Sequence, residues 1–307
     1  MGPGTRMLAL ADRGAPPRNR VRRGYPPAMD GPAIDRRPSG RLGSEAIHLV
    51  LPSLVLALFL TPLVLALLGS LRPPGTAPPT SIDLWPAGAG ASNYADVLGR
   101  PVLRQQLLNS LLVAAIAVPA GTLVASWAGF AIARLPRRAA FVLLGITVAG
   151  IAMPASTMFI GRLILFRVVG ITDTPLPLIA PALIGITPLL VLLFAWSYHT
   201  IPGEIYDLAA EAGLGQVGTW WRVAVPMRRG AVPVAVAVAF VISWGNLSDP
   251  LLYIYDERWF TLPLGLVSLA ELPPTDQGLM LAGAVIAIAP ALVTAYLVQR
   301  HLYERRV

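Results

Sequence analysis

The sequence offers few side chains that could carry out chemistry. It contains no cysteine, and all 24 of its basic residues are arginine because lysine is absent. This composition excludes a disulfide or thiolate metal site, a P-loop, whose lysine reaches the nucleotide phosphates, and a lysine Schiff base. No cluster has metal-ligand spacing, and no Ser/His/Asp set stands in a catalytic context. We therefore predict a protein that is not an enzyme, with no catalytic residue, no metal and no cofactor.

One pattern typical of a nucleotide site does occur. Residues Gly213 to Gly218 fit G-x-G-x-x-G, the dinucleotide-binding fingerprint. The fingerprint binds a dinucleotide only where it follows a strand and opens a helix. Here it follows a predicted helix, and the chain has no βαβ pattern. We interpret this pattern as a turn.

The segment 199–230 carries the most informative pattern. Pro202 suits the first position of a helix, and Glu204 in the first turn favours the helix dipole. Apolar side chains then recur with helical spacing and predict one apolar face. That face consists of Ile205, Leu208, Ala209 and Ala212. The acids Glu204, Asp207 and Glu211 fall on the other side, and Gly213 ends the helix. Such a helix fits a groove of another protein; a helix resting on lipid headgroups, the alternative, usually displays basic residues.

Long apolar segments must position this helix. Of 307 residues, 55% are hydrophobic and only 13% are charged, and the mean hydropathy is +0.65. A soluble domain carries about a quarter charged residues, whereas about twenty apolar residues let a helix cross a bilayer. We predict an all-α polytopic membrane protein with six spans. They lie at about 47–71, 107–132, 140–166, 176–198, 231–254 and 279–299.

The first residues differ from the rest of the chain. They are rich in Arg, Pro and Gly without hydrophobic periodicity, which predicts a disordered extension over 1–45 and a membrane domain over 46–307. Met29 is a second candidate for the start of translation. Near the ends of spans, we interpret His48, Tyr198 and His301 as interfacial anchors.

The placement of arginine predicts the orientation. Eighteen arginines lie in the two tails and in the loops 133–139 and 199–230, against six in the alternate segments, where we count Arg162. Basic residues are enriched on the cytoplasmic side of membrane proteins. Both termini and the loop 199–230 are therefore expected in the cytoplasm of a multi-pass protein of the bacterial inner membrane. Arginines clustered beside apolar segments fit this topology better than a nucleic-acid partner, so none is expected.

Segment 207–226 resembles the EAA loop of binding-protein-dependent ABC importer permeases. In that loop E-A-A is followed by three residues, a glycine, nine residues and I-x-L-P. With Gly213 as the glycine, the first positions fall on Asp207, Leu208 and Ala209, and the last on Val223 to Pro226. Asp207 for the usual Glu and Leu208 for the usual Ala argue against free interchange of ATPases.

The resemblance implies that 204–212 is a cytoplasmic coupling helix seated in a cleft of a separate ATPase subunit. Closure of the ATPase dimer on ATP would then move the helix and the spans. The residues that the resemblance assigns to this coupling are Glu204, Asp207, Leu208, Ala209, Glu211, Gly213 and Pro226.

Other segments resemble the maltose-type carbohydrate permeases, in the same order along the chain. They are Asn93-Tyr94 with Leu108 to Leu111, Phe130 to Leu135, Ile201 to Glu204, Ser243 to Asn246 with Pro250-Leu251, and Phe260 to Leu266. On this basis the chain is identified as the second permease of a carbohydrate importer with the type I ABC importer permease fold. The implied partners are a homologous second permease, two copies of a cytoplasmic ATPase, an extracytoplasmic solute-binding (lipo)protein, a sugar-like substrate and the lipid bilayer.

Polar side chains near the outer end of the fifth predicted span form a candidate translocation path. These are Trp244, Asn246 and Asp249. An ionisable group at membrane depth is expected to face a cavity or a partner, although Asp249 beside Pro250 could also sit at the interface. Asn and Trp together could bind a sugar, or could pack against the partner permease.

Three alternatives stay open at this point. An ABC permease for another solute, such as a polyamine, shares the loop but fits the flanking segments less well. An ion-coupled secondary transporter usually has ionisable groups in mid-membrane and two repeats in one chain, for which six spans are few. An integral membrane enzyme would need a catalytic constellation, and none is recognisable.

Overall fold

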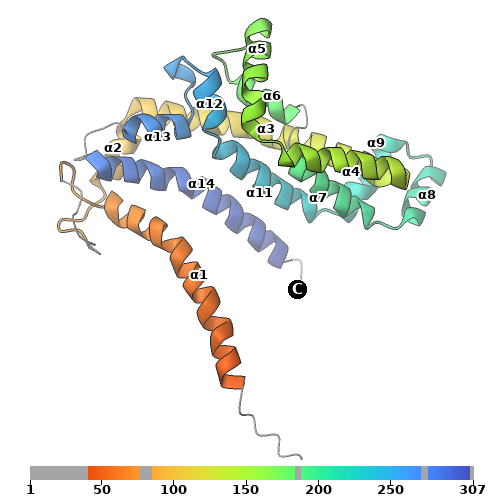
Figure 1. Cartoon of the computed structure of the whole chain (residues 1–307), viewed down its shortest axis with the longest axis horizontal. Helices are drawn as coiled ribbons and strands as arrows, with labels where there is room; N and C mark the ends of the chain where they lie inside the picture. Colours follow the sequence, from red (N-terminus) through yellow and green to blue (C-terminus); the bar gives the residue numbers. More distant parts are fainter. Residues whose placement is uncertain (1–40, 77–84, 184–187, 271–275, 305–307) are drawn as a thin grey trace, which may run out of the picture. The chain divides into compact units, whose positions relative to one another are not determined.

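The computed structural model describes residues 41–76, 85–183, 188–270 and 276–304. The chain divides into two compact units, 1–54, of which only the helical residues 41–54 are described, and 55–307. All regular structure in the described ranges is helical (Figure 1). The elements, in chain order, are α1 (Arg41–Ser70), α2 (Ser92–Gly99), α3 (Pro101–Arg134), α4 (Arg137–Ala152), η1 (Ala155–Met158), α5 (Phe159–Val169), α6 (Leu176–Leu183), α7 (Pro188–His199), α8 (Gly203–Glu211), α9 (Gln216–Thr219), the π-helical turn η2 (Trp220–Ala224), α10 (Val225–Met227), α11 (Ala231–Trp244), α12 (Ser248–Tyr253), η3 (Glu257–Trp259), α13 (Leu262–Ala270) and α14 (Gln277–Tyr303).

The described helices account for the predicted spans. Four are long and apolar enough to cross a membrane on their own: Val50–Ser70, Pro101–Arg134, Leu176–His199 and Gln277–Tyr303. Two further pairs meet the same criterion only together, and each pair is bent. The pairs are Arg137–Ala152 with Ser156–Val169, and Gln216–Met227 with Ala231–Trp244. If each pair is one span, the number is six, as predicted, but the second pair begins inside the predicted loop 199–230 and not at residue 231. The predicted extension falls almost wholly on 1–40, outside the described residues, and α1 already begins at Arg41.

The third predicted span, 140–166, is a broken helix. The axes of Arg137–Ala152 and Ser156–Val169 differ by 91°. Met153 between them has extended backbone, with φ −76° and ψ 124°, as the residue before a proline prefers. Pro154 then lacks the N–H that would continue the ladder of helical hydrogen bonds. Local chemistry at the dipeptide Met153-Pro154 therefore divides this predicted span into two helices.

The fifth predicted span, 231–254, is also interrupted. α11 ends at Trp244, and α12 starts only at Ser248. Between them Asn246 bonds locally: its Oδ1 accepts the Asp249 N–H at 3.2 Å, and its Nδ2 donates to Asp249 Oδ2 at 2.8 Å. Side-chain bonds of this kind compete with the helical pattern. The predicted continuous helix is therefore divided where its polar residues lie.

α3 forms the centre of the unit 55–307 and packs against α6, α7 and α11. Its close packing on α7 depends on Gly129, where a Cβ atom would lie 2.6 Å from Phe194 Cβ and 2.7 Å from the Ala195 nitrogen. Small residues permit such close contact of helices in membranes. Ala114 and Ala235 are buried in the same core.

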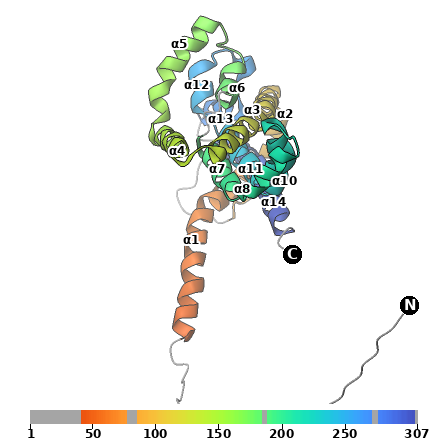
Figure 2. The same cartoon turned by 90° about the vertical axis from the view of Figure 1, so that its right-hand side faces the viewer.

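Two regions of the unit 55–307 concern function. α8 lies at one end of α3, beside α7 and α9 (Figure 1). α5 and α12 lie next to each other and away from α8, and the view turned by 90° agrees (Figure 2). α5 and α12 are also in direct contact. The predicted coupling residues and the predicted path residues thus occupy separate places in the fold.

Candidate functional site: the α8 surface and the cavity beside α12

The end of α8 is a Schellman motif. Gly213 has a φ of 76°, and its N–H donates to the Ala210 carbonyl at 2.9 Å, while Leu214 N–H donates to the Ala209 carbonyl at 3.0 Å. The left-handed conformation favours glycine, because an L side chain strains it. The prediction that Gly213 ends the helix is confirmed. A Cβ atom at Gly213 would meet nothing within 4 Å, so the site has room for a side chain.

The two faces of α8 differ from the predicted ones. Tyr206 and Ala209 are buried, at 7% and 6% exposure, and Ile205 is half-buried. Leu208 is 59% exposed, and Ala212 is exposed as well. The predicted apolar face of Ile205, Leu208, Ala209 and Ala212 is therefore wrong for two of its four members. The aromatic ring of Tyr206 takes the inner side, because the core offers aromatic partners there.

The outer face of α8 carries acids without partners. Glu204, Asp207 and Glu211 are exposed, and within the described ranges their carboxylates form no hydrogen bond or ion pair. Leu208, 59% exposed, stands among them. Exposed aliphatic side chains beside unpaired charges are typical of a surface that another protein covers.

The inner face of α8 joins an aromatic cluster, which we define as Trp127, Phe130, Tyr198, Tyr206 and Trp220. Phe130 of α3 meets Tyr206 and Tyr198 edge to face, with ring centroids 6.0 Å and 6.1 Å apart. Trp127 meets Trp220 in the same manner at 5.1 Å. Edge-to-face pairs at these distances are favourable beyond the burial of their area. The cluster thus connects α8 to α3, α7 and η2.

Polar contacts hold the rings of the cluster in place. Ser126 Oγ lies 2.7 Å from the Tyr198 hydroxyl and accepts the Trp220 indole N–H at 3.0 Å. The Tyr206 hydroxyl donates to the Tyr198 carbonyl at 3.2 Å. Tyr198 is therefore a core residue with no exposed surface, and its prediction as an interfacial anchor is wrong.

Arg134 closes the cluster at the end of α3. Its Cζ lies over the Tyr206 ring, 4.9 Å from the centroid, and 5.7 Å from the centroid of Phe130. Burial raises the pKa of the Tyr206 hydroxyl above its ordinary value of 10.0, although Arg134 acts in the opposite direction. The ring is therefore neutral at physiological pH and presents its face to a cation.

The remaining predicted coupling residues lie on the helix that follows. Ala224 of η2 is fully buried in the core, whereas Pro226 in α10 is exposed. Arg228 Nη2 donates to the Thr200 carbonyl at 2.9 Å, so the end of the loop is fixed to the end of α7. Among the described residues, Pro226 makes no hydrogen bond or ion pair with the acids of α8. Its neighbour Ala224 belongs to the same hydrophobic core as Tyr206 of α8.

The three predicted path residues line one cavity. Trp244, Asn246 and Asp249 border a space of about 490 Å³ between α3, α5, α6, α7, α11 and α12. Trp244 is only 5% exposed, its indole N–H donates to the Ala287 carbonyl at 2.7 Å, and its ring stacks on Phe240. The indole therefore serves mainly to pack α11 against α14, while Asn246 and Asp249 supply polar atoms.

Sequence reasoning missed the partner of Asp249. Arg162 Nη1 of α5 lies 3.9 Å from Asp249 Oδ1, and the two side chains are only 17% and 12% exposed. Arg162 also lines the cavity, although the sequence count placed it among the outer loops. An arginine inside the predicted span 140–166 and an acid in the span 231–254 were the available signal, because buried charges at membrane depth require a partner.

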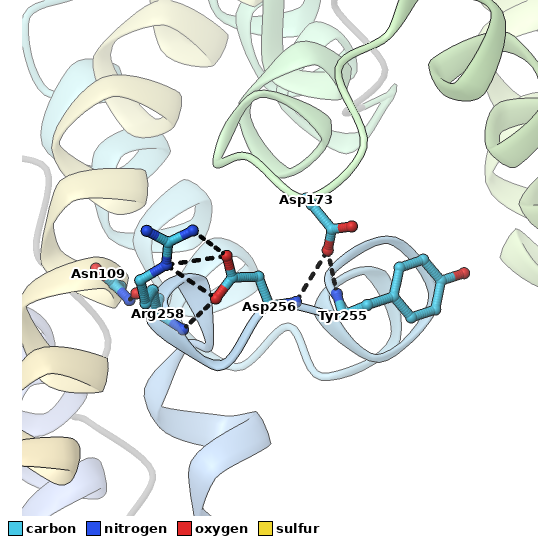
Figure 3. Close-up of polar contacts among 5 residues, drawn as sticks. All are labelled: Asn109, Asp173, Tyr255, Asp256 and Arg258. Carbon is cyan, nitrogen blue, oxygen red and sulfur yellow. Dashed lines mark hydrogen bonds and ion pairs between the residues drawn. The ribbon is translucent and has the colours of Figure 1, made fainter.

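A second set of polar contacts fixes the segment after α12. We call it the loop clasp: the side chains of Asn109, Ser110 and Asp173 bound to the backbone of 255–262. Asp173 accepts the N–H groups of Tyr255 and Asp256 (Figure 3). Its own N–H donates to Tyr253, and its φ of 60° is in the left-handed region, which Asp tolerates better than most residues.

The other half of the loop clasp comes from α3. Asn109 Nδ2 donates to the carbonyls of Arg258 at 2.8 Å and Phe260 at 2.9 Å, and Ser110 Oγ accepts the Leu262 N–H at 2.8 Å. Two segments that resembled the carbohydrate permeases separately, 108–111 and 260–266, therefore bind one another. Within the clasp segment Arg258 pairs with Asp256 at 2.6 Å, and its hydrogen bonds lower the pKa of the Asp256 carboxyl (Figure 3).

Known proteins that are similar to the chain include permease proteins of transport systems. The chain is 23% identical to the probable ABC transporter permease protein YurM of Bacillus subtilis (strain 168) over 197 residues. The aligned region covers 63% of this chain and 65% of YurM. The chain is 23% identical over 247 residues to the arabinooligosaccharides transport system permease protein AraQ of the same organism, 80% of this chain and 87% of AraQ. No protein-family model matches the chain.

A solved structure has the same fold. A chain of a bacterial ABC transporter involved in the import of the acidic polysaccharide alginate superposes with a TM-score of 0.71 at 17% identity, over 86% of this chain and 98% of that one. The chain therefore has the fold of a chain of an ABC transporter and helices that can cross a membrane, and its sequence relatives are named as permease proteins. The resemblance to sugar permeases is confirmed, since one relative is named for arabinooligosaccharide transport.

Proposed function

We propose that this chain is one permease of an ATP-driven importer for a carbohydrate or sugar-like solute, and that α8 couples it to a separate ATPase. The assembly would include a homologous second permease, two ATPase copies and an extracytoplasmic solute-binding protein. The solute class rests on the names of similar proteins, which include an arabinooligosaccharide permease and an alginate importer.

The two-sided construction of α8 carries this proposal. Its outer face holds Glu204, Asp207 and Glu211 without partners among the described residues. Its inner face places Tyr206 in the aromatic cluster, against rings from α3 and α7. A force applied to the acids would therefore reach two membrane helices through packed rings, because close-packed interiors transmit strain.

This arrangement supports an alternating-access mechanism. ATP binds the closed ATPase dimer more tightly, so nucleotide shifts the assembly toward that state. α8, held in the cleft of one ATPase copy, would follow the closure as a rigid body, and α3 and α7 would follow α8. Hydrolysis would then return the helices to their first arrangement.

The orientation belongs to the same proposal. The arginine excess favours a position of both termini, the extension 1–45 and the loop 199–230 on the cytoplasmic side of a bacterial inner membrane. Because the chain has no cysteine, single-cysteine variants can be labelled without background. Ala210→Cys on α8 is expected to react with an impermeant maleimide only from the cytoplasmic side, and Ser92→Cys on α2 only from the outer side. The reverse pattern would overturn the orientation.

The central experiment is Asp207→Arg in the full reconstituted importer. The substitution reverses the charge at the proposed ATPase contact and is expected to abolish uptake and solute-stimulated ATP hydrolysis. Asp96→Arg is the matched control, since Asp96 is an exposed acid on the short helix α2 and has no hydrogen-bond or ion-pair partner among the described residues. Uptake measured in proteoliposomes and ATPase subunits co-purified with the chain report the result.

The two readouts separate a coupling defect from misfolding. Asp207→Arg should assemble with the second permease as the wild type does, but retain less ATPase. Normal uptake and normal ATPase retention in Asp207→Arg would refute the coupling role of α8.

A further inference from the structure

The cavity beside α12 has the size and lining of a small-molecule site. Its volume of about 490 Å³ falls within the range of roughly 300–1,000 Å³ found for ligand pockets. Most of its wall is apolar, with a small number of polar side chains. These are Ser110, Arg162, Ser243, Asn246, Ser248, Asp249 and Thr261.

The charges of the cavity lining cancel. Arg162 and Asp249 are the ionisable residues among those that line it, and they face each other with Nη1 and Oδ1 3.9 Å apart. This separation exceeds hydrogen-bond distance, so the two side chains are not bonded directly to each other at these atoms. A ligand group beside the pair can therefore form hydrogen bonds with either side chain. An ion entering such a neutral pair would lose its hydration without a net opposite charge to replace it.

Both members of the pair have hydrogen-bonding capacity to spare. A guanidinium has five N–H donors and a carboxylate about four acceptor positions. Asn246 occupies one position on Asp249, and Tyr253 interacts with Arg162. In addition, Thr261 is 5% exposed, and its hydroxyl oxygen has no partner among the described residues. Sugar hydroxyls both donate and accept, so they match a site that presents donors and acceptors side by side.

We propose that this cavity binds an uncharged, polyhydroxylated solute, with Arg162 as donor and Asp249 as acceptor for its hydroxyl groups. The proposal rests on the importer function above and narrows it: the site selects against anionic and cationic sugars, and this permease contacts the solute itself. Arg162, which the sequence did not single out, is then a specificity-determining residue.

The test uses the complete importer in lipid nanodiscs and two probes, arabinobiose, which is uncharged, and digalacturonate, which is anionic. Saturation-transfer NMR on the wild type is expected to show transfer to arabinobiose and little to digalacturonate. The double variant Arg162→Gln/Asp249→Asn removes both charges together, so it avoids an isolated buried charge. It should lose about tenfold in arabinobiose affinity, as expected for the loss of a hydrogen bond to a charged group.

Two further variants sharpen the test. Asp249→Asn leaves Arg162 as a net positive charge, so digalacturonate should gain transfer relative to arabinobiose. Arg167→Gln is the matched control on α5, because Arg167 is exposed and does not line the cavity; it should bind both probes as the wild type does. Equal thermal melting of the double variant and the wild type shows that folding is intact.

Three results would overturn the proposal: wild-type transfer to both probes alike, unchanged arabinobiose binding by the double variant, or no transfer in the wild type because the second permease fills the cavity. Each can occur while ATP-driven uptake and the effect of Asp207→Arg remain as expected. The site can therefore fail without the importer function failing.

Discussion

α8 and the loop clasp hold their segments by different kinds of contact. α8 rests on the edges and faces of aromatic rings, with one hydrogen bond from Tyr206 to Tyr198. The loop clasp fixes its segment through side chains that bind backbone groups directly, among them Asn109 and Asp173. Hydrogen bonds demand a particular geometry, whereas apolar burial is non-directional. The two segments are therefore held differently: α8 mainly by ring packing, and the clasp segment mainly by directed hydrogen bonds.

The two regions also differ in whether their carboxylates have bonding partners. α8 presents three carboxylates that have no partner in the described part of the chain. In the loop clasp, Asp173 and Asp256 both have bonded carboxylates. An unpaired charge costs little where water reaches it, and it can pair with a partner subunit. We infer that the α8 surface is built for a further protein, while the loop clasp is complete within this chain.

Removal of the Tyr206 ring should produce the largest effect. Tyr206→Ala deletes a buried aromatic side chain and its contact with Arg134, and such truncations cost about 3–5 kcal/mol. Uptake should fall to background, because α8 loses its connection to α3. Tyr206→Phe keeps the ring and removes only the bond to the Tyr198 carbonyl, at about 1 kcal/mol, so uptake should persist. Denaturant unfolding in micelles and proteoliposome uptake measure both quantities.

The pair of Tyr206 variants discriminates between packing and hydrogen bonding. If Tyr206→Phe abolished uptake as completely as Tyr206→Ala, the hydroxyl rather than the ring would carry the connection. The proposed contrast between the two regions would then be wrong, since α8 too would depend on a directed bond.

Asn109→Ala should give the next largest effect. It leaves the carbonyls of Arg258 and Phe260 without their donor, and a buried unsatisfied group costs about 1–3 kcal/mol. The stability loss should be accompanied by faster proteolysis of the segment 255–262, with α8 unaffected. Gln105→Ala is the control, because Gln105 donates to Asn109 Oδ1 and, within the described residues, to no backbone group of the clasp segment. A variant whose clasp segment stayed as resistant as the wild type would show that Asn109 does not fix it.

The sequence predicted what local chemistry decides. Pro202 and Gly213 mark the two ends of α8, and the structure has the helix from Gly203 to Glu211. Residues that depend on tertiary neighbours were harder to place. Leu208 has helical spacing with Ile205, yet it is exposed, because the core that α8 meets is aromatic and takes Tyr206 instead. Periodicity identifies an amphipathic helix but not which side a particular core will accept.

Sequence patterns could not predict which residues of distant segments contact each other. Arg162 and Asp249 were each visible as charges near a span, but only the fold brings α5 to α12. The loop clasp is similar, since a side chain that binds a distant backbone carbonyl leaves no spacing to recognise. The resemblance of both clasp segments to the carbohydrate permeases located these residues without indicating that they touch.

Substitution of Gly213 should have a smaller effect on stability than on function. Gly213→Ala meets open space within this chain, so only the φ of 76° opposes it, at about 1 kcal/mol. Gly213→Asn should cost less, because Asn tolerates the left-handed region. Gly213→Trp should fold as the alanine variant does and yet lose uptake, since only the ATPase cleft would reject the ring. Full uptake by Gly213→Trp would mean that no partner approaches this position.

The exposed Asp256–Arg258 pair should give the smallest effect. The bonds from Arg258 lower the pKa of Asp256 below its ordinary value of 3.8. A depressed carboxyl pKa adds stability above the unfolded value, and this contribution disappears as the pH falls through the folded value. Asp256→Asn should therefore melt slightly below the wild type at neutral pH, and the two melting temperatures should converge below pH 3.8. A difference that grew on acidification would have the wrong sign for this pair. The carbonyls of Arg258 and Phe260 should keep their bonds from Asn109 in both proteins, because these bonds involve no titrating group.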